Sequence, residues 1–172
     1  MGTPLEAIGD LVRAYQALPN LVTGGQPTAA HLEALEKAGV KIVIDLRDPM
    51  EDRHIDEPAL LTALQMEYVN APVGTGTLND PTMDFVLGVL RRSREQMAFM
   101  HCNSGNRVGG VLLPYFMLDL AMCEAAALAE AMRVGLLSVE YLQWALDYVY
   151  RHECQQRRRE STTAEEGSRA PH

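Results

Sequence analysis

The sequence predicts an α/β fold in which a sheet is covered by helices on both faces. Short apolar segments rich in β-branched residues alternate along the chain with segments whose apolar residues recur at helical spacing. The run VKIVIDL at 40–46 is almost entirely apolar, as expected of a strand that is buried on both faces. The alternation continues without an internal repeat, which favours a single sheet flanked by helices.

The first half of the chain is predicted to contain three helices and three strands. Pro4 suits the first turn of the first helix, and Thr28 is the predicted N-cap of the second. The highly charged segment 47–57 is interpreted as a solvated connection. Arg47 is the exception, because it leaves the end of a buried strand, where open α/β sheets bind ligands. The predicted elements are helices at 4–18, 28–39 and 58–64, and strands at 21–23, 40–46 and 67–72.

The second half is predicted to contain one more strand and four helices. Asp80 precedes Pro81 and is interpreted as the N-cap of a helix that closes near Arg92. A strand at 97–100 and helices at 106–120, 124–133 and 138–151 follow. The last segment has no apolar residues beyond alanine and proline, so we expect it to be disordered. The predicted organisation is one domain over 1–154 and a disordered tail over 155–172.

The composition of the chain indicates its domain size and excludes some classes of binding partner. A chain of 172 residues that is 47% hydrophobic and 22% charged can support one ordinary core. Its net charge of -8 argues against a nucleic acid or an anionic membrane as the partner. The three cysteines are widely spaced and form no metal-ligand signature. Because the N-terminus lacks a signal-peptide pattern and the cysteines fit a reducing compartment, we expect a cytoplasmic protein.

The stretch from Met97 to Val111 is the strongest candidate for a functional site. It reads as a strand, a tight polar loop and the start of a helix, with Cys102 at the strand end and Arg107 after the loop. Backbone N–H groups of such a loop converge with a helix N-terminus, which favours an anion and an ionised thiol. The alternative is that Cys102 is a buried small hydrophobe, as we interpret Cys123.

Four motifs occur in a characteristic order along the chain. They are GGQPT at 24–28, VIDLR at 43–47, the strand before Pro72, and HCNSGNR at 101–107. In this order they resemble the superfamily of cysteine-dependent protein tyrosine and dual-specificity phosphatases. Within it, the chain is most similar to the phosphatase-like domain of beta-lactamase-hydrolase-like proteins. The resemblance covers about residues 19–120. It implies a protein-tyrosine-phosphatase-like three-layer fold, with a central, mostly parallel sheet of four to five strands.

The resemblance also implies roles for the residues of the HCNSGNR motif. Cys102 would be the nucleophile, and Arg107 would bind the oxyanion. His101 would support the loop and help to keep the thiol ionised, although it could simply hydrogen-bond the backbone. No metal and no organic cofactor is implied. The phosphate-binding backbone amides would belong to Asn103, Ser104, Gly105 and Asn106.

The sequence departs from the family pattern in three places. Four residues separate the cysteine from the arginine, one fewer than in ordinary members, so one amide of the loop would be lost or moved. Val108 stands where such phosphatases often carry a Ser or Thr that assists release of the thiol. The segment that usually supplies the aspartate general acid reads GTGT at 74–77. Asp80 is then a nearby candidate acid, although a helix cap is the simpler interpretation.

These residues lead to one predicted function and two alternatives. The predicted function is hydrolysis of phosphate monoesters through a phosphocysteine on Cys102. The short loop also resembles that of rhodanese-type sulfurtransferases, where a persulfide on Cys102 would need no general acid. The second alternative is a non-catalytic domain that binds phosphate or another oxyanion. The expected partner is accordingly a phosphorylated substrate or a small oxyanion.

Overall fold

The computed structural model describes the backbone of residues 2–168 and the side chains of residues 2–156. The first half of the chain contains α1 (Pro4–Ala7), β1 (Tyr15–Leu18), β2 (Leu21–Gly24), α2 (Ala29–Lys37), β3 (Ile42–Asp45), α3 (Glu57–Ala63) and β4 (Glu67–Asn70). The second half contains the 3₁₀ helix η1 (Thr75–Thr77), α4 (Asp80–Arg92), β5 (Ala98–His101), α5 (Asn106–Leu118), α6 (Glu124–Val134) and α7 (Val139–Ser168). None of the helices in the described part is long and apolar enough to cross a bilayer.

The five strands form one sheet in the order β1-β2-β5-β3-β4. β1 pairs antiparallel with β2, and the remaining neighbours are parallel. The register aligns the last residues of the four parallel strands, which are Gly24, His101, Asp45 and Asn70. The connections that follow these strands therefore meet at one edge of the sheet, where ligands bind in this class of fold.

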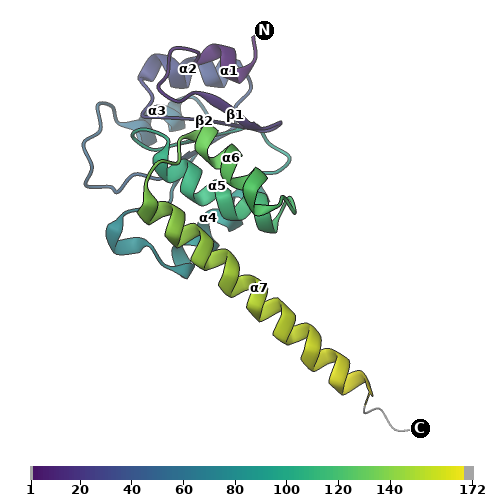
Figure 1. Ribbon diagram of the computed structural model, residues 1–172. Helices are drawn as coiled ribbons and strands as arrows, with labels where there is room; N and C mark the ends of the chain where they lie inside the picture. Colours follow the sequence, from purple (N-terminus) through teal and green to yellow (C-terminus); the bar gives the residue numbers. More distant parts are fainter. Residues whose placement is uncertain (1, 169–172) are drawn as a thin grey trace.

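The sheet separates two layers of helices (Figure 1). Val22, Val43 and Phe99 point into a core with residues of α2, α3 and the segment around α1. Neighbouring strand residues, such as Ile44 and Met100, point into the opposite core, which α4, α5, α6 and α7 complete. The predicted α/β fold, with a mostly parallel sheet between two helical layers, is confirmed.

The predicted helix over 4–18 is wrong. α1 ends at Ala7, and Tyr15–Leu18 instead forms β1, which pairs back onto β2 across a short connection. Ile8 and Leu11 are buried in the core although they lie outside a helix. The spacing of Ile8 and Leu11 therefore indicated correctly that these side chains are buried. It did not indicate the backbone conformation of Tyr15–Leu18, which is set by pairing with β2.

The connection between β4 and α4 differs from expectation at the N-cap of α4. The N-cap of α4 is Asn79, whose side chain accepts the Thr82 N–H at 3.0 Å, so Asp80 is the first helical residue rather than the cap. Asparagine and aspartate cap helices about equally well, and the sequence alone did not separate them. The GTGT segment contains η1, in which the Thr77 hydroxyl accepts the Gly74 N–H at 2.8 Å.

The last helix is longer than predicted. α7 continues to Ser168, where we expected disorder from Gln155 onward. The sequence QQRRRESTTAEE is poor in apolar residues, but Gln, Arg, Glu and Ala are good helix formers and no proline interrupts them. Figure 1 shows α7 running from the helical layer out beyond the rest of the domain. Residues 169–172 of the predicted tail lie outside the described residues.

Candidate active site

Cys102 is the first residue after β5, and its side chain is buried at the carboxyl edge of the sheet. The Gly105 N–H donates a hydrogen bond to the Cys102 Sγ at 3.2 Å. Gly105 has a φ of +83°, a left-handed conformation that turns the chain into α5. Within the described chain, the N–H groups of Asn103, Ser104 and Asn106 donate to no protein group. The loop therefore presents free donors at the N-terminus of a helix, as anion binding requires.

The Arg107 guanidinium is fixed on one side by protein acceptors. Its NH1 group donates to the backbone carbonyls of Val73 at 3.2 Å and Leu46 at 3.4 Å. Both terminal nitrogens also bond the Glu51 carboxylate, with NH2 at 2.8 Å from Oε2. Burial opposes the charge of Arg107, but the Glu51 hydrogen bonds and the neighbouring Cys102 outweigh it and raise the pKa of Arg107. The arginine is thus held charged beside the thiol.

Glu51 is a candidate site residue that sequence reasoning missed. Its carboxylate bonds Arg107, accepts the Asn103 amide N–H at 2.7 Å, and accepts the backbone N–H of Asp48 at 2.7 Å. The hydrogen bond from Arg107 lowers the pKa of Glu51, against the opposing effect of burial. The sequence predicts a solvated connection over 47–57, and Glu51 departs from this prediction. The usable signal was position, because the segment follows β3, whose last residue is the neighbour of His101 in the sheet.

The GGQPT motif supports the loop after Cys102 from the side of β2. The Gln26 N–H donates to the Asn103 carbonyl at 3.2 Å. A Cβ atom at Gly25 would lie 2.8 Å from the same carbonyl oxygen, so a larger residue there would displace the loop. This close packing explains why a glycine stands directly before Gln26.

A buried polar network lies beneath the loop. Arg47 is 1% exposed, and it donates to both carboxylate oxygens of Asp45 at 2.9 Å and to Glu57 at 2.6 Å. Tyr68 also donates to Asp45, at 2.9 Å. Burial disfavours the ionised carboxylate, but the hydrogen bonds from Arg47 outweigh it and lower the pKa of Asp45 to about 2. Burial and the Asp45 charge raise the pKa of Tyr68 to about 12.

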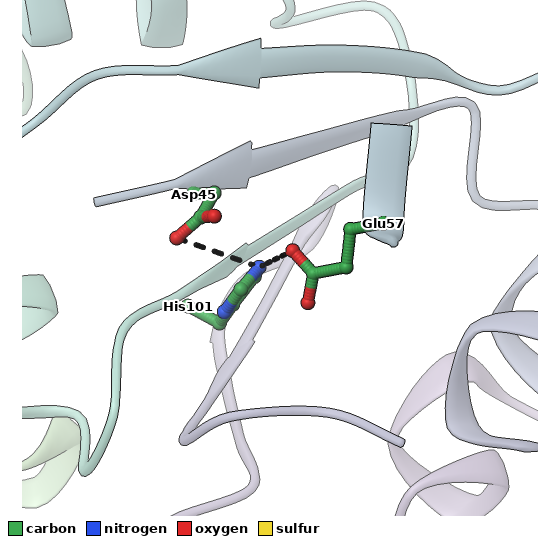
Figure 2. A group of neighbouring side chains, drawn as sticks. All are labelled: Asp45, Glu57 and His101. Atoms are coloured by element: carbon green, nitrogen blue, oxygen red, sulfur yellow. Dashed lines mark ion pairs between the residues drawn. The ribbon is translucent and has the colours of Figure 1, made fainter. Parts of the chain in front are cut away.

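His101 connects this network to Cys102. Its Nε2 lies 3.4 Å from Glu57 and 3.9 Å from Asp45, and Figure 2 shows the ring directed toward both carboxylates. The ring also stacks on Phe99, with centroids 5.3 Å apart. Neither ring nitrogen has a hydrogen-bond partner among the described residues, so the alternative of a simple backbone hydrogen bond is wrong. Its surroundings fix His101 directly before the nucleophile candidate.

The same three residues raise the question of a metal ion. Asp45, Glu57 and His101 are buried, and one ligand atom from each lies within 4.8 Å of the others. Both carboxylates already bind the Arg47 guanidinium, however, which is a cation in the middle of the cluster. A divalent ion would have to displace it or lie beside it at a large electrostatic cost. The cluster therefore fits a structural charge network rather than a metal centre.

Asp80 lies at the first turn of α4 and is paired with α7. Its carboxylate accepts hydrogen bonds from Arg151 at 2.5 and 3.1 Å. Its carboxylate contacts neither Cys102 nor Arg107 in the described structure. A role of Asp80 as general acid stays a prediction.

Comparisons with known proteins give a consistent result. A family model described as DSP-PTPase phosphatase fused to NAD+ kinase matches residues 10–135. The fold is similar to that of a putative phosphatase (DUF442) from Shewanella putrefaciens CN-32, with a TM-score of 0.72 and 22% identity over 86% of this chain and 97% of that one. It is also similar to Tk-PTP in its active form, with a TM-score of 0.67 and 17% identity over 81% and 97% of the two chains. For TpbA of P. aeruginosa the TM-score is 0.64 and the identity 24%, over 81% and 84%. A search of curated proteins gave no match.

Proposed function

Since the chain belongs to the family of DSP-PTPase phosphatases fused to NAD+ kinase, we propose that it hydrolyses phosphate monoesters through a phosphocysteine on Cys102. One observation carries this proposal: Cys102 lies in a loop of free backbone N–H groups beside a guanidinium that Glu51 orients. A structure of a TpbA variant in complex with pTyr, with a TM-score of 0.63 to this chain, adds support for a phosphorylated substrate.

The hydrogen bonds of Arg107 define which donors are left for substrate. A guanidinium has five N–H groups, and protein acceptors take up NH1 and one N–H of NH2. The Nε–H and the second N–H of NH2 remain, and together they form one edge of the planar fork. That edge matches two oxygens of a phosphoryl group.

The reaction then proceeds in two displacements. The Cys102 thiolate attacks phosphorus, an S–P bond forms, and the bond to the ester oxygen breaks. The leaving alkoxide or phenoxide takes a proton from solvent or from an acid. Water next attacks phosphorus, releases inorganic phosphate and regenerates the thiolate. In both steps the loop amides and Arg107 stabilise the equatorial oxygens, where charge develops.

Intact-protein mass spectrometry tests the proposal. The wild-type protein would be mixed briefly with an aryl phosphate or with thiosulfate, quenched in acid and weighed, with Cys102→Ser and Cys123→Ser as paired variants. We expect a phospho-adduct that Cys102→Ser loses and Cys123→Ser keeps. A persulfide on Cys102 without a phospho-adduct would favour sulfur transfer. Phosphate binding without either adduct or turnover would favour the non-catalytic domain.

A further inference from the structure

Arg13 lies against the catalytic loop in an unusual backbone conformation. Its φ is +58°, in the left-handed region that residues other than glycine seldom adopt. A Cβ atom built on Gly105 would lie 3.2 Å from the Cβ of Arg13 and 3.5 Å from its Cγ. The stem of the arginine therefore lies directly beside the loop that surrounds Cys102. Strained residues of this kind cluster at functional sites.

The segment that carries Arg13 is also connected to the same loop indirectly, through Gly25. The Gly25 N–H donates to the Val12 carbonyl at 2.7 Å. Gly25 in turn packs against the carbonyl of Asn103, at the other end of the loop. Arg13 is thus held between two anchored points, and its backbone position relative to the anion site is defined.

The charge of Arg13 has no protein partner. Its side chain is exposed, and it forms no ion pair or hydrogen bond in the described structure. As far as Gln156, the remaining arginines all pair with a carboxylate: Arg47, Arg53, Arg91, Arg92, Arg94, Arg107, Arg133 and Arg151. The arginine beside the catalytic loop is the exception, so its guanidinium is available to an external anion.

We propose that Arg13 binds a second anionic group of the substrate, so that the preferred substrates are phosphate monoesters carrying another acidic group near the phosphate. This inference rests on the proposed phosphatase function. The protein has a net charge of -8, which repels such substrates in general. The unpaired guanidinium of Arg13, whose stem contacts the loop at Gly105, offsets this repulsion locally and recognises carboxylate or phosphate by its planar fork.

The test compares three small substrates of nearly the same shape. They are phenyl phosphate, 3-carboxyphenyl phosphate and its neutral counterpart 3-carbamoylphenyl phosphate. The variant Arg13→Asn removes the charge with a residue that tolerates the left-handed conformation. Arg92→Gln is the control, because it removes an exposed arginine whose partner is Glu67 in the sheet.

We expect the wild-type protein to show a KM about two- to fivefold lower for the carboxy than for the carbamoyl substrate, as befits one solvent-exposed charge pair. Arg13→Asn should lose this preference and Arg92→Gln should keep it. Raising the ionic strength should reduce it in the wild-type protein. If Arg13→Asn keeps the preference for the carboxy substrate, or raises the KM of all three substrates by the same factor, the inference is wrong.

Calorimetric titration of the Cys102→Ser protein with the same compounds separates this inference from the proposed function. A carboxy-over-carbamoyl preference that depends on Arg13 would support the anion site even if the wild-type protein turned over none of the three esters. In that case the phosphatase proposal would fail and the inference would stand as a binding site. Equal affinities for the two compounds would overturn the inference alone.

Discussion

Arg107 is held by three acceptor residues from two connections of the sheet, the one after β3 and the one after β4. Leu46 follows β3, Val73 follows β4, and Glu51 lies between β3 and α3. Each contact removes rotational freedom from a long side chain, so the energetic cost of orienting the fork is met by the fold before an anion arrives. Glu51 contributes through position and charge, and it leaves the Nε edge free.

A lysine at position 107 would keep the charge but not this geometry. Arg107→Lys should weaken binding of vanadate or sulfate about tenfold or more, because one ammonium cannot replace two charge-assisted hydrogen bonds. Circular dichroism should show an unchanged fold. Arg92→Lys, on the exposed side of α4, serves as the control. Wild-type affinity in Arg107→Lys would show that this guanidinium does not bind the anion.

Glu51 should contribute to stability in a pH-dependent manner. Its pKa is lowered from the ordinary 4.5, chiefly by the Arg107 hydrogen bond. A lowered pKa in the folded state means that the stabilisation is complete above about pH 4.5 and is lost as the pH falls through the folded-state value. Urea unfolding should therefore show a larger difference between wild type and Glu51→Gln at pH 7 than at pH 3. A difference independent of pH would contradict the assignment.

At the scale of elements, close packing of α5 against α6 and the segment after it places the loop. A Cβ atom at Gly109 would lie 2.6 Å from the Ala131 carbonyl oxygen and 2.7 Å from the Leu136 backbone nitrogen. Backbone atoms cannot retreat as a flexible side chain can. Because Gly109 has no side chain, the first turn of α5, which carries Arg107, can lie directly against these backbone atoms.

A methyl group at position 109 should lower the stability of the protein. Gly109→Ala should destabilise the protein by about 1–3 kcal/mol through overpacking. Gly88→Ala is the matched control, because no heavy atom lies within 4 Å of its Cβ position on α4. That variant should be stabilising by up to about 1 kcal/mol, since alanine is the better helix former. Thermal unfolding of the two variants measures the contrast, and equal melting temperatures would refute the packing argument.

The connection from β4 to α4 bears on the general acid. Residues 71–79 read APVGTGTLN and contain no carboxylate, and Asp80 is paired with Arg151. General acid catalysis is typically worth about 10²–10⁴-fold, so alkyl phosphates, whose leaving groups need a proton, should react far more slowly than aryl phosphates. Asp80→Asn should change aryl turnover little and cost about 0.2–1 kcal/mol through the lost surface ion pair. A selective loss of alkyl turnover in Asp80→Asn would instead identify Asp80 as the acid.

For the molecule as a whole, Arg47 connects the carboxyl edge of the sheet to the helical layer beside it. It bonds Asp45 at the end of β3 and Glu57 at the start of α3, and His101 at the end of β5 faces both carboxylates. Two carboxylates and a guanidinium without access to water are stable only as a set. The network therefore couples the stability of the domain to the position of Cys102.

Removal of the Arg47 guanidinium should lower the unfolding free energy of the whole domain. Arg47→Met keeps the apolar stem but leaves two buried carboxylates without their guanidinium, which should cost about 3–5 kcal/mol of unfolding free energy. Arg92→Met removes an exposed pair and should cost no more than about 1 kcal/mol. Denaturant titration at pH 7 distinguishes the two. A similar small loss in both variants would mean that water reaches the cluster.

Local signals in the sequence determined most of the secondary structure and the positions of two site residues. Apolar periodicity placed β2 to β5 and α2 to α6 because their burial follows the helix and strand periods. The order of GGQPT, VIDLR and HCNSGNR identified the family and placed Cys102 and Arg107 at the end of β5 and the start of α5.

Tertiary contacts decided the rest. Tyr15–Leu18 became a strand because β2 offered a free edge, which no spacing within the segment records. Glu51 reached Arg107 across 56 positions of sequence, and Arg13 packed against Gly105 in the loop. Such contacts depend on the register that aligns the strand ends, and their residues are ordinary charged side chains in polar segments. The sequence determined where Cys102 and Arg107 lie, whereas only the folded chain determined which charges hold them and which charge was left unpaired.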